Sequence, residues 1–212
     1  SSHKDEAINK NKFNEIKVEN NVILMEHKYN PEKIDLIEKY KFDENSFEYT
    51  QGMSFWNIFI PTLDSVRYSE IIESLMKVGK HVFITGDTGV GKTAIINSII
   101  KNMVGTEEYT KKIMNFSATT SSEKTQESLE DGLEKIKGKS VLGGQNGKKL
   151  IIFIDDINMP EPTKHGSHPP IELLRQLIDN GYYFDRPKFF QKHIEDYVMI
   201  ACGGRPIGGR SK

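Results

Sequence analysis

The stretch "GDTGVGKT", residues 86–93, constrains the fold most, because three glycines and a Lys-Thr pair stand at fixed spacing. An apolar run, "HVFIT", precedes it, and a run whose isoleucines recur with helical period, "AIINSIIKNM", follows it. The spacing Gly-x4-Gly-Lys-Thr is the pattern of a phosphate-binding loop, which requires a strand before it and a helix after it. We therefore predict a strand–loop–helix unit that holds the phosphates of a nucleotide.

Each residue type in this stretch has a physical role in holding phosphate. The glycines let the backbone turn tightly and aim N–H groups at one anion, and the helix N-terminus adds a positive dipole. Lys92 is expected to reach the β- and γ-phosphates and to act in catalysis, while the Thr93 hydroxyl is expected to ligate Mg²⁺. The predicted phosphate-binding set is Gly86, Thr88, Gly89, Val90, Gly91, Lys92, Thr93 and Ala94.

A second run, "LIIFIDD", ends in the acids Asp155 and Asp156. A continuous apolar run is typical of a parallel strand that is buried on both faces. An acid at the carboxyl end of such a strand can hold Mg²⁺ beside the threonine of the phosphate-binding loop. We therefore assign Asp155 to the metal, together with Thr93.

Strand and helix patterns alternate along the chain, which predicts an α/β fold with a mostly parallel sheet between helices. We expect a short helix before the loop, with Ser69 as its N-cap and Gly79 at its end. An amphipathic helix is expected over residues 121–139, with Leu129, Leu133 and Ile136 on one face. The remaining expectations are strands over residues 112–118 and 196–202, a turn or hairpin over 141–149, a helix over 169–181 and a hairpin over 182–190.

Composition argues against two classes of partner. The formal net charge is -1, from 29 basic and 30 acidic side chains, so no global field favours nucleic acid or a membrane surface. The longest apolar runs are too short to span a bilayer. The chain has one cysteine, Cys202, so an internal disulfide is impossible, which suits a reducing compartment.

With these motifs in view, the chain resembles a dynein heavy chain of the axonemal type, specifically the third AAA+ module of its motor ring. Besides the loop, the resemblance rests on "IPTLDSVRY", "MNFSATTSSEKTQ", "FIDDINMP", "PPIELLRQLIDNGYYFDR" and "ACGGRPIGGR". It covers residues 55–210 and implies the large α/β subdomain of a P-loop AAA+ protein. We expect a flexible segment or cloning remnant over residues 1–20, a connecting extension over 21–59, and the core over 60–212, ending before the helical lid.

The resemblance also implies ligands and partners. Ile60, Pro61 and Thr62 would line the adenine pocket of an ATP or ADP site with Mg²⁺, and Asp156 would stand at the catalytic-acid position. The implied partners are neighbouring AAA+ modules, dynein intermediate and light chains, and microtubules contacted through parts outside this chain. The implied location is the cytoplasm, the cytoskeleton and the axoneme of a cilium or flagellum.

Two residues depart from the pattern of hydrolysing relatives. A glutamate often stands where this chain has Asp156, which is one methylene shorter, and a proton acceptor must come within about 3 Å of its target. Gly203 occupies a place where related proteins often carry a polar residue that senses the γ-phosphate. Arg205 and Arg210 are either fingers for a neighbouring site or ordinary loop arginines. We expect slow or absent ATP hydrolysis by the isolated chain.

Three functions follow as alternatives. The first is an ATP-binding module that regulates a microtubule motor whose main hydrolysis belongs to another module. The second is a structural ring segment locked on its nucleotide, and the third is another AAA+ ATPase. A metal pair at His165 and His168 is not expected, because no further ligand clusters there.

Overall fold

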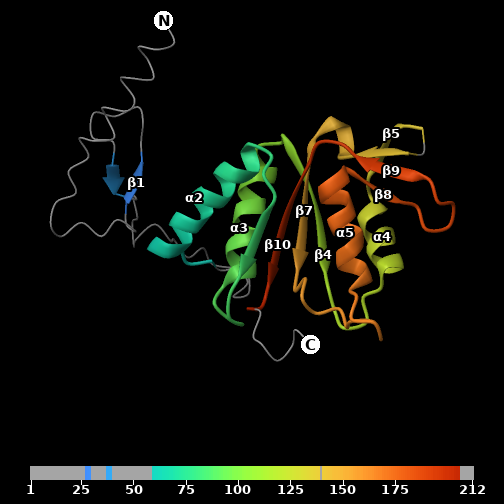
Figure 1. Ribbon diagram of the computed structural model, residues 1–212. Helices are drawn as coiled ribbons and strands as arrows, with labels where there is room; N and C mark the ends of the chain where they lie inside the picture. Colours follow the sequence, from blue (N-terminus) through green and yellow to red (C-terminus); the bar gives the residue numbers. More distant parts are fainter. Residues whose placement is uncertain (1–26, 30–36, 40–58, 139, 206–212) are drawn as a thin grey trace, which may run out of the picture. The chain divides into compact units, whose positions relative to one another are not determined.

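The computed structural model describes residues 27–29, 37–39, 59–138 and 140–205 (Figure 1). The chain divides into two units, residues 1–67 and 68–212. In the first unit, β1 (His27–Tyr29) pairs antiparallel with β2 (Ile37–Lys39). The helix α2 (Leu63–Lys77) crosses the boundary between the units. The expected segment 1–20, most of the expected extension 21–59, and Arg210 lie outside the described residues.

A parallel sheet forms the centre of the second unit. Its strands are β3 (Val82–Thr85), β4 (Tyr109–Asn115), β7 (Lys149–Asp155) and β10 (Tyr197–Gly203). They lie in the order β3-β10-β7-β4, and every pair is parallel. The prediction of an α/β fold with a mostly parallel sheet is confirmed. All four carboxyl ends therefore meet at one edge, where ligands bind in open α/β sheets.

Both faces of the sheet are covered by helices, as Figure 1 shows. The helix α3 (Lys92–Gly105) packs with the second half of α2 on one face, and α4 (Ser122–Glu130) and α5 (Pro169–Asn180) pack on the other. Alternate side chains of β7 reach opposite cores: Ile152 joins α4 and α5, whereas Phe153 joins α2 and α3. Burial on both faces explains why this strand is continuously apolar.

Both ends of α5 follow the sequence signals, whereas the start of α2 departs from them. Gly181 is left-handed, with φ 72°, and closes α5, while the Pro169–Pro170 pair opens it. The expected N-cap at Ser69 is wrong, because α2 begins at Leu63. There the Thr62 hydroxyl accepts a hydrogen bond from the Ser65 N–H at 3.2 Å, which supports the first turn.

The expected helix over residues 121–139 ends early, so this prediction is wrong in its second half. The helix α4 stops at Glu130, and Gly132 turns the chain with φ 80°. The Lys112 ammonium donates to both the carbonyl and the carboxylate of Asp131, at 2.8 Å each. These contacts fix the turn, so Leu133 still packs on the core while Ile136 is 51% exposed.

A second, smaller sheet follows from this turn. It contains β5 (Glu134–Lys137), β6 (Val141–Gly143), β8 (Tyr182–Phe184) and β9 (Gln191–Ile194) in the order β5-β6-β9-β8. The hairpin predicted over residues 182–190 exists, but it is longer than predicted, because its returning strand β9 lies beyond residue 190. The stretch predicted as a turn or hairpin contains β6 and a short 3-10 helix, Gln145–Gly147.

A buried polar network attaches this hairpin to α4. The Lys192 ammonium lies 2.6 Å from a carboxylate oxygen of Glu130 and 2.6 Å from one of Asp185. Its side chain is 11% exposed and that of Asp185 is 7% exposed, so water screens this ion pair poorly. The Tyr183 hydroxyl donates to Glu130 at 3.0 Å, which completes the cluster.

We predict that Lys192→Met lowers the free energy of unfolding by about 2 kcal/mol, because it leaves two neighbouring carboxylates without a cation. Urea unfolding followed by circular dichroism measures this loss. Arg175→Met, which removes a guanidinium from an exposed ion pair with Glu172, is the matched control and should leave stability nearly unchanged. Equal losses in both variants would contradict the account.

His81 joins the start of β3 to β10. Its Nδ1 accepts a hydrogen bond from the Met199 N–H at 3.0 Å, and its ring stacks on Tyr197 with 5.2 Å between centroids. Partial burial lowers the pKa of His81 below its usual 6.5. The neutral ring is therefore the form that fits the folded state, and protonation would remove the acceptor.

The pKa of His81 is lower in the folded chain than in the unfolded chain, where it is about 6.5. The stabilisation that neutral His81 provides is therefore fully present above pH 6.5. It is lost as the pH falls through the pKa that His81 has in the folded chain. His81→Asn keeps an acceptor near the position of Nδ1 but does not titrate. We predict that the wild-type chain loses more unfolding free energy than His81→Asn between pH 7.5 and 5.5. Parallel pH dependences in urea titrations would refute this role.

Candidate nucleotide-binding site

The glycine-rich loop has the backbone that phosphate binding requires. Gly89 and Gly91 are left-handed, with φ 81° and 85°, a region that side chains other than glycine's rarely adopt. No heavy atom lies within 4 Å of where a Cβ on either residue would stand, so the space beside them is open. The requirement for glycine therefore comes from the turn itself, which is of the kind that forms anion-binding concavities.

The helix α3 starts directly after the second left-handed glycine. Its first intrahelical bond runs from the Ile95 N–H to the Gly91 carbonyl at 3.0 Å. The N–H groups of the three residues before Ile95 precede the helical ladder, as in every α-helix. These groups and the positive end of the helix dipole point toward the loop, an arrangement suited to an anion.

The Lys92 ammonium folds back onto the loop. It donates to the carbonyl of Gly86 at 3.0 Å and to the carbonyl of Asp87 at 2.7 Å. These partners are neutral carbonyls, so an anionic phosphate offers the ammonium a stronger interaction. Lys92 is therefore placed to bind phosphate at the Gly86–Asp87 end of the loop.

Cys202 links the two residues predicted to hold Mg²⁺. It lies on β10, between the strand that leads into the loop and the strand that ends in Asp155. Its Sγ–H donates to Asp155 Oδ1 at 2.7 Å, and it also lies within hydrogen-bonding reach of Thr93. The pKa of this thiol is raised to about 11, mainly because the thiol is buried and to a smaller extent because it donates to Asp155. Sequence reasoning did not find this role.

The donor set around Cys202 fits Mg²⁺. Thr93 supplies a hydroxyl and Asp155 a carboxylate, both hard oxygen donors of the kind that Mg²⁺ prefers. Asp155 Oδ1 is already held by Cys202 and by the Asp156 N–H at 3.0 Å, whereas Oδ2 accepts no hydrogen bond from the residues that the structure describes. Such a site would bind the metal through one or two side chains and the phosphates of the nucleotide.

Asp156 has an unusual backbone. Its φ is 54°. The residue is exposed and follows directly after the last residue of β7. Its carbonyl accepts from the Met159 N–H at 2.9 Å, so the chain turns sharply directly after the predicted metal ligand. Aspartate tolerates this left-handed region better than most residues, although some strain remains.

The space beside Gly203, where a side chain would stand, is occupied by the side chain of Asn158. A Cβ on Gly203 would stand 2.9 Å from Asn158 Oδ1, and that oxygen accepts a hydrogen bond from the Gly204 N–H at 2.9 Å. A side chain on Gly203 would therefore displace the Asn158 amide and disturb its hydrogen bond with Gly204. Sequence reasoning noted the glycine but missed Asn158, whose position depends on the turn after β7.

The sheet brings most of the predicted residues together. The phosphate-binding set, Asp155 and Asp156 lie at the carboxyl edge. Ile60, Pro61 and Thr62 belong to the first unit, and their adenine-binding role stays a prediction.

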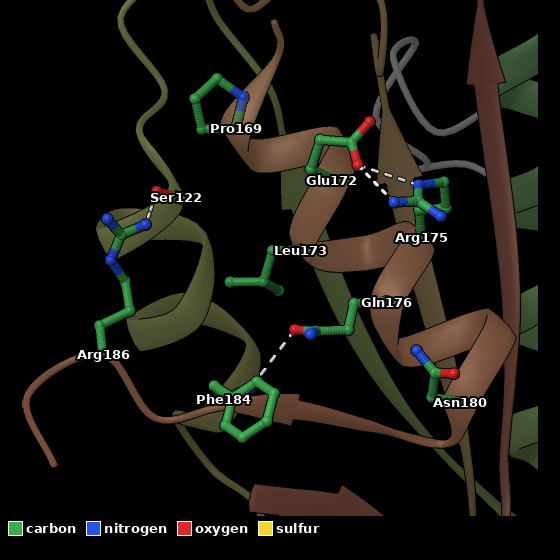
Figure 2. A pocket seen from close by; sticks show the side chains of 9 residues that line it. All are labelled: Ser122, Pro169, Glu172, Leu173, Arg175, Gln176, Asn180, Phe184 and Arg186. Atoms are coloured by element: carbon green, nitrogen blue, oxygen red, sulfur yellow. Dashed lines mark hydrogen bonds and ion pairs between the residues drawn. The ribbon is translucent and has the colours of Figure 1, made fainter. Parts of the chain in front are cut away.

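A separate cavity of about 330 Å³ lies between α4, α5 and β8 (Figure 2). Figure 2 shows Arg186 reaching Ser122 on one side, while Glu172 and Arg175 pair with each other on the other. None of the predicted site residues lines it. This cavity is therefore distinct from the glycine-rich loop.

Two further findings concern the described part of the chain. Its histidines, cysteine and acids form no cluster of three or more that could hold a metal ion, and His165 is exposed. None of its helices combines the length and the apolar character needed to cross a membrane.

The parallel sheet, the glycine-rich loop before α3 and the acid at the end of β7 together define a P-loop protein of the AAA+ large-subdomain type. Residues 47–212 match the family described as the P-loop containing dynein motor region. This chain belongs to that family.

Curated relatives agree with the family match. The chain is 43% identical over 166 residues to human "Dynein axonemal heavy chain 6" and 40% identical to the "Dynein-1-beta heavy chain, flagellar inner arm I1 complex" of Chlamydomonas reinhardtii. Each match covers 78% of this chain and 4% of the relative. Mouse "Dynein axonemal heavy chain 12" is 38% identical over 73% of this chain and 5% of its own length. The chain thus spans a small part of these relatives.

The burial of Cys202 gives a direct test of this geometry. Its 1% exposure and raised pKa predict slow reaction with a disulfide reagent such as DTNB at pH 8 in the absence of nucleotide and metal. A rise from 9.0 to about 11 alone reduces the thiolate fraction roughly 100-fold. Because the chain has one cysteine, the absorbance change reports this residue alone. Equal rates for folded and urea-unfolded protein would contradict the described contacts.

Proposed function

We propose that this chain is an ATP-binding AAA+ module of an axonemal dynein heavy chain, corresponding to the third module of the motor ring. The observation that carries the proposal is the convergence of the left-handed glycine loop, Lys92, Thr93 and Asp155 at one edge of the sheet. The family match and the names of the relatives support the dynein assignment. The third position rests on the sequence resemblance.

Different residues of the chain would bind the phosphates, the metal ion and the adenine of Mg-ATP or Mg-ADP. The loop amides and Lys92 bind phosphate, while Thr93 and Asp155 hold Mg²⁺, which neutralises phosphate charge when it is bound. Cys202 holds Oδ1 of Asp155, so the carboxylate that would bind the metal is fixed in place. Ile60, Pro61 and Thr62 are proposed to line the adenine pocket.

Slow hydrolysis is the second part of the proposal. Asp156 is proposed as the catalytic acid, but its short side chain stands on a left-handed backbone. Gly203 offers no side chain to a γ-phosphate. The module would then regulate the motor by closing or opening with nucleotide state, a population shift biased by differential binding.

The parent protein would supply the remaining parts. We propose that the partners are neighbouring AAA+ modules of the same heavy chain, intermediate and light chains of the parent protein, and microtubules contacted through parts outside this chain, in the axoneme or the cytoplasmic cytoskeleton. A ring segment locked on its nucleotide is the alternative that the same residues, Asp156 and Gly203, favour. Another AAA+ ATPase would share the loop and the sheet.

We predict that the full chain binds Mg-ADP and Mg-ATP reversibly and that Lys92→Ala weakens both by about 50-fold or more, because several charge-assisted hydrogen bonds are lost. Titration of a fluorescent ADP analogue measures the affinity, and a chase with unlabelled nucleotide measures exchange. Lys101→Ala is the matched control, since Lys101 is an exposed lysine on the same helix.

Three outcomes separate the functions. Free exchange in the wild type and a loss confined to Lys92→Ala support the regulatory module. Nucleotide that co-purifies and does not exchange supports the locked segment. No binding by folded protein would contradict the proposal for this chain.

A further inference from the structure

Two cations converge on Asp87, the residue that follows the first glycine of the loop. The Lys92 ammonium donates to its carbonyl at 2.7 Å, and the Arg205 guanidinium lies 3.2 Å from its carboxylate. Asp87 thus joins the residue expected to bind the β- and γ-phosphates to an arginine 118 positions later in the chain. The function proposed above does not use Arg205.

The backbone before Arg205 is fastened to the base of the loop. The Gly86 N–H donates to the Gly203 carbonyl at 3.3 Å, and the Thr85 hydroxyl donates to the Gly204 carbonyl at 3.1 Å. On the other side, Asn158 Oδ1 accepts from the Gly204 N–H at 2.9 Å. These contacts hold the backbone that precedes Arg205 beside the loop. The Arg205 side chain itself remains able to exchange one partner for another.

The ion pair itself is easily exchanged. The side chains of Arg205 and Asp87 are 63% and 57% exposed, and ion pairs this exposed contribute little to stability. A terminal phosphate carries more negative charge than one carboxylate and offers three oxygens. Its geometry also matches the planar fork of a guanidinium.

We propose that Arg205 binds the terminal phosphate of a nucleoside triphosphate held by its own loop, and that Asp87 is its counter-ion when no triphosphate is bound. This inference rests on the proposed nucleotide site. It assigns Arg205 to its own site, in place of the two alternatives drawn from the sequence, a finger for a neighbour and an ordinary loop arginine. A diphosphate would leave Arg205 on Asp87.

The position of Lys92 places Arg205 near the outer phosphates of a bound nucleotide. Lysine at this point of the loop pattern reaches the β- and γ-phosphates, and here its ammonium lies against the Asp87 carbonyl. The Asp87 carboxylate, and with it Arg205, therefore marks the end of the loop where the terminal phosphate would lie. Arg205 would report the presence of that phosphate, because only the triphosphate displaces it from Asp87.

The test compares Mg-ADP with a Mg-bound, non-hydrolysable ATP analogue by isothermal titration of the full chain. We expect Arg205→Ala to weaken the ATP analogue about tenfold and to leave ADP within twofold, since one charge-assisted contact is lost. Asp87→Asn should strengthen the ATP analogue several-fold, because it removes the competing carboxylate. Arg175→Ala, which breaks an exposed ion pair on α5, is the matched control and should change neither affinity.

The outcomes separate this inference from the function on which it rests. If the wild type binds both nucleotides and Arg205→Ala leaves the ratio of their affinities unchanged, the pair with Asp87 is a surface ion pair only and the inference is overturned. Should Arg205→Ala fail to fold, Arg205→Gln and Asp87→Asn carry the test, and an unchanged ratio in both overturns it. If the folded wild type binds neither nucleotide, the result contradicts the proposed function, and the inference that rests on it is overturned as well.

Discussion

The register of the parallel sheet is the constraint on which the site depends. On one side of β10, Cys202 pairs with Ile84 of β3. On the other side, the preceding residue Ala201 pairs with Ile154 of β7. This register places the end of β10 between the glycine-rich loop and Asp155. A shift of one residue would turn Cys202 to the opposite face and separate Asp155 from Thr93. The continuous apolar sequence of β7 and β10, buried on both faces, supplies the packing that holds the register.

The fold class and the backbone of the glycine-rich loop were predictable from the sequence, because both depend on local signals. The glycine spacing requires left-handed backbone at Gly89 and Gly91, and an apolar run that ends in acids is typical of a buried parallel strand. The end of α4 was not predictable in this way. The helical spacing of Leu129, Leu133 and Ile136 continues past Glu130, but a long-range bond from Lys112 to Asp131 and the turn at Gly132 override it.

The contacts near the candidate site that sequence reasoning missed are between residues far apart in the chain. Cys202 meets Asp155, Asn158 fills the space beside Gly203, and Arg205 pairs with Asp87 only once the strand order is known. No periodicity or spacing signals these pairs. They follow from the crossover that inserts β10 between β3 and β7, which is a property of the topology.

The site combines features of phosphate binding with features that disfavour rapid hydrolysis. The loop, Lys92 and Asp155 have the positions that binding requires. The acid that follows, Asp156, has a short side chain on a strained backbone, and Gly203 has none. Under the proposed function, such a module would hold nucleotide for long periods, and both the regulatory and the structural alternative use that property.

The most direct test of the central claim, that the loop and Asp155 form one Mg-nucleotide site, is the Mg²⁺ dependence of ADP affinity. We would measure the dissociation constant of ADP with Mg²⁺ and with EDTA, in the wild type and in Asp155→Asn. The account predicts that Mg²⁺ tightens binding in the wild type, that Asp155→Asn removes most of this gain, and that affinity in EDTA is the same for both. A gain from Mg²⁺ that survives Asp155→Asn unchanged would show that Asp155 does not take part in the site.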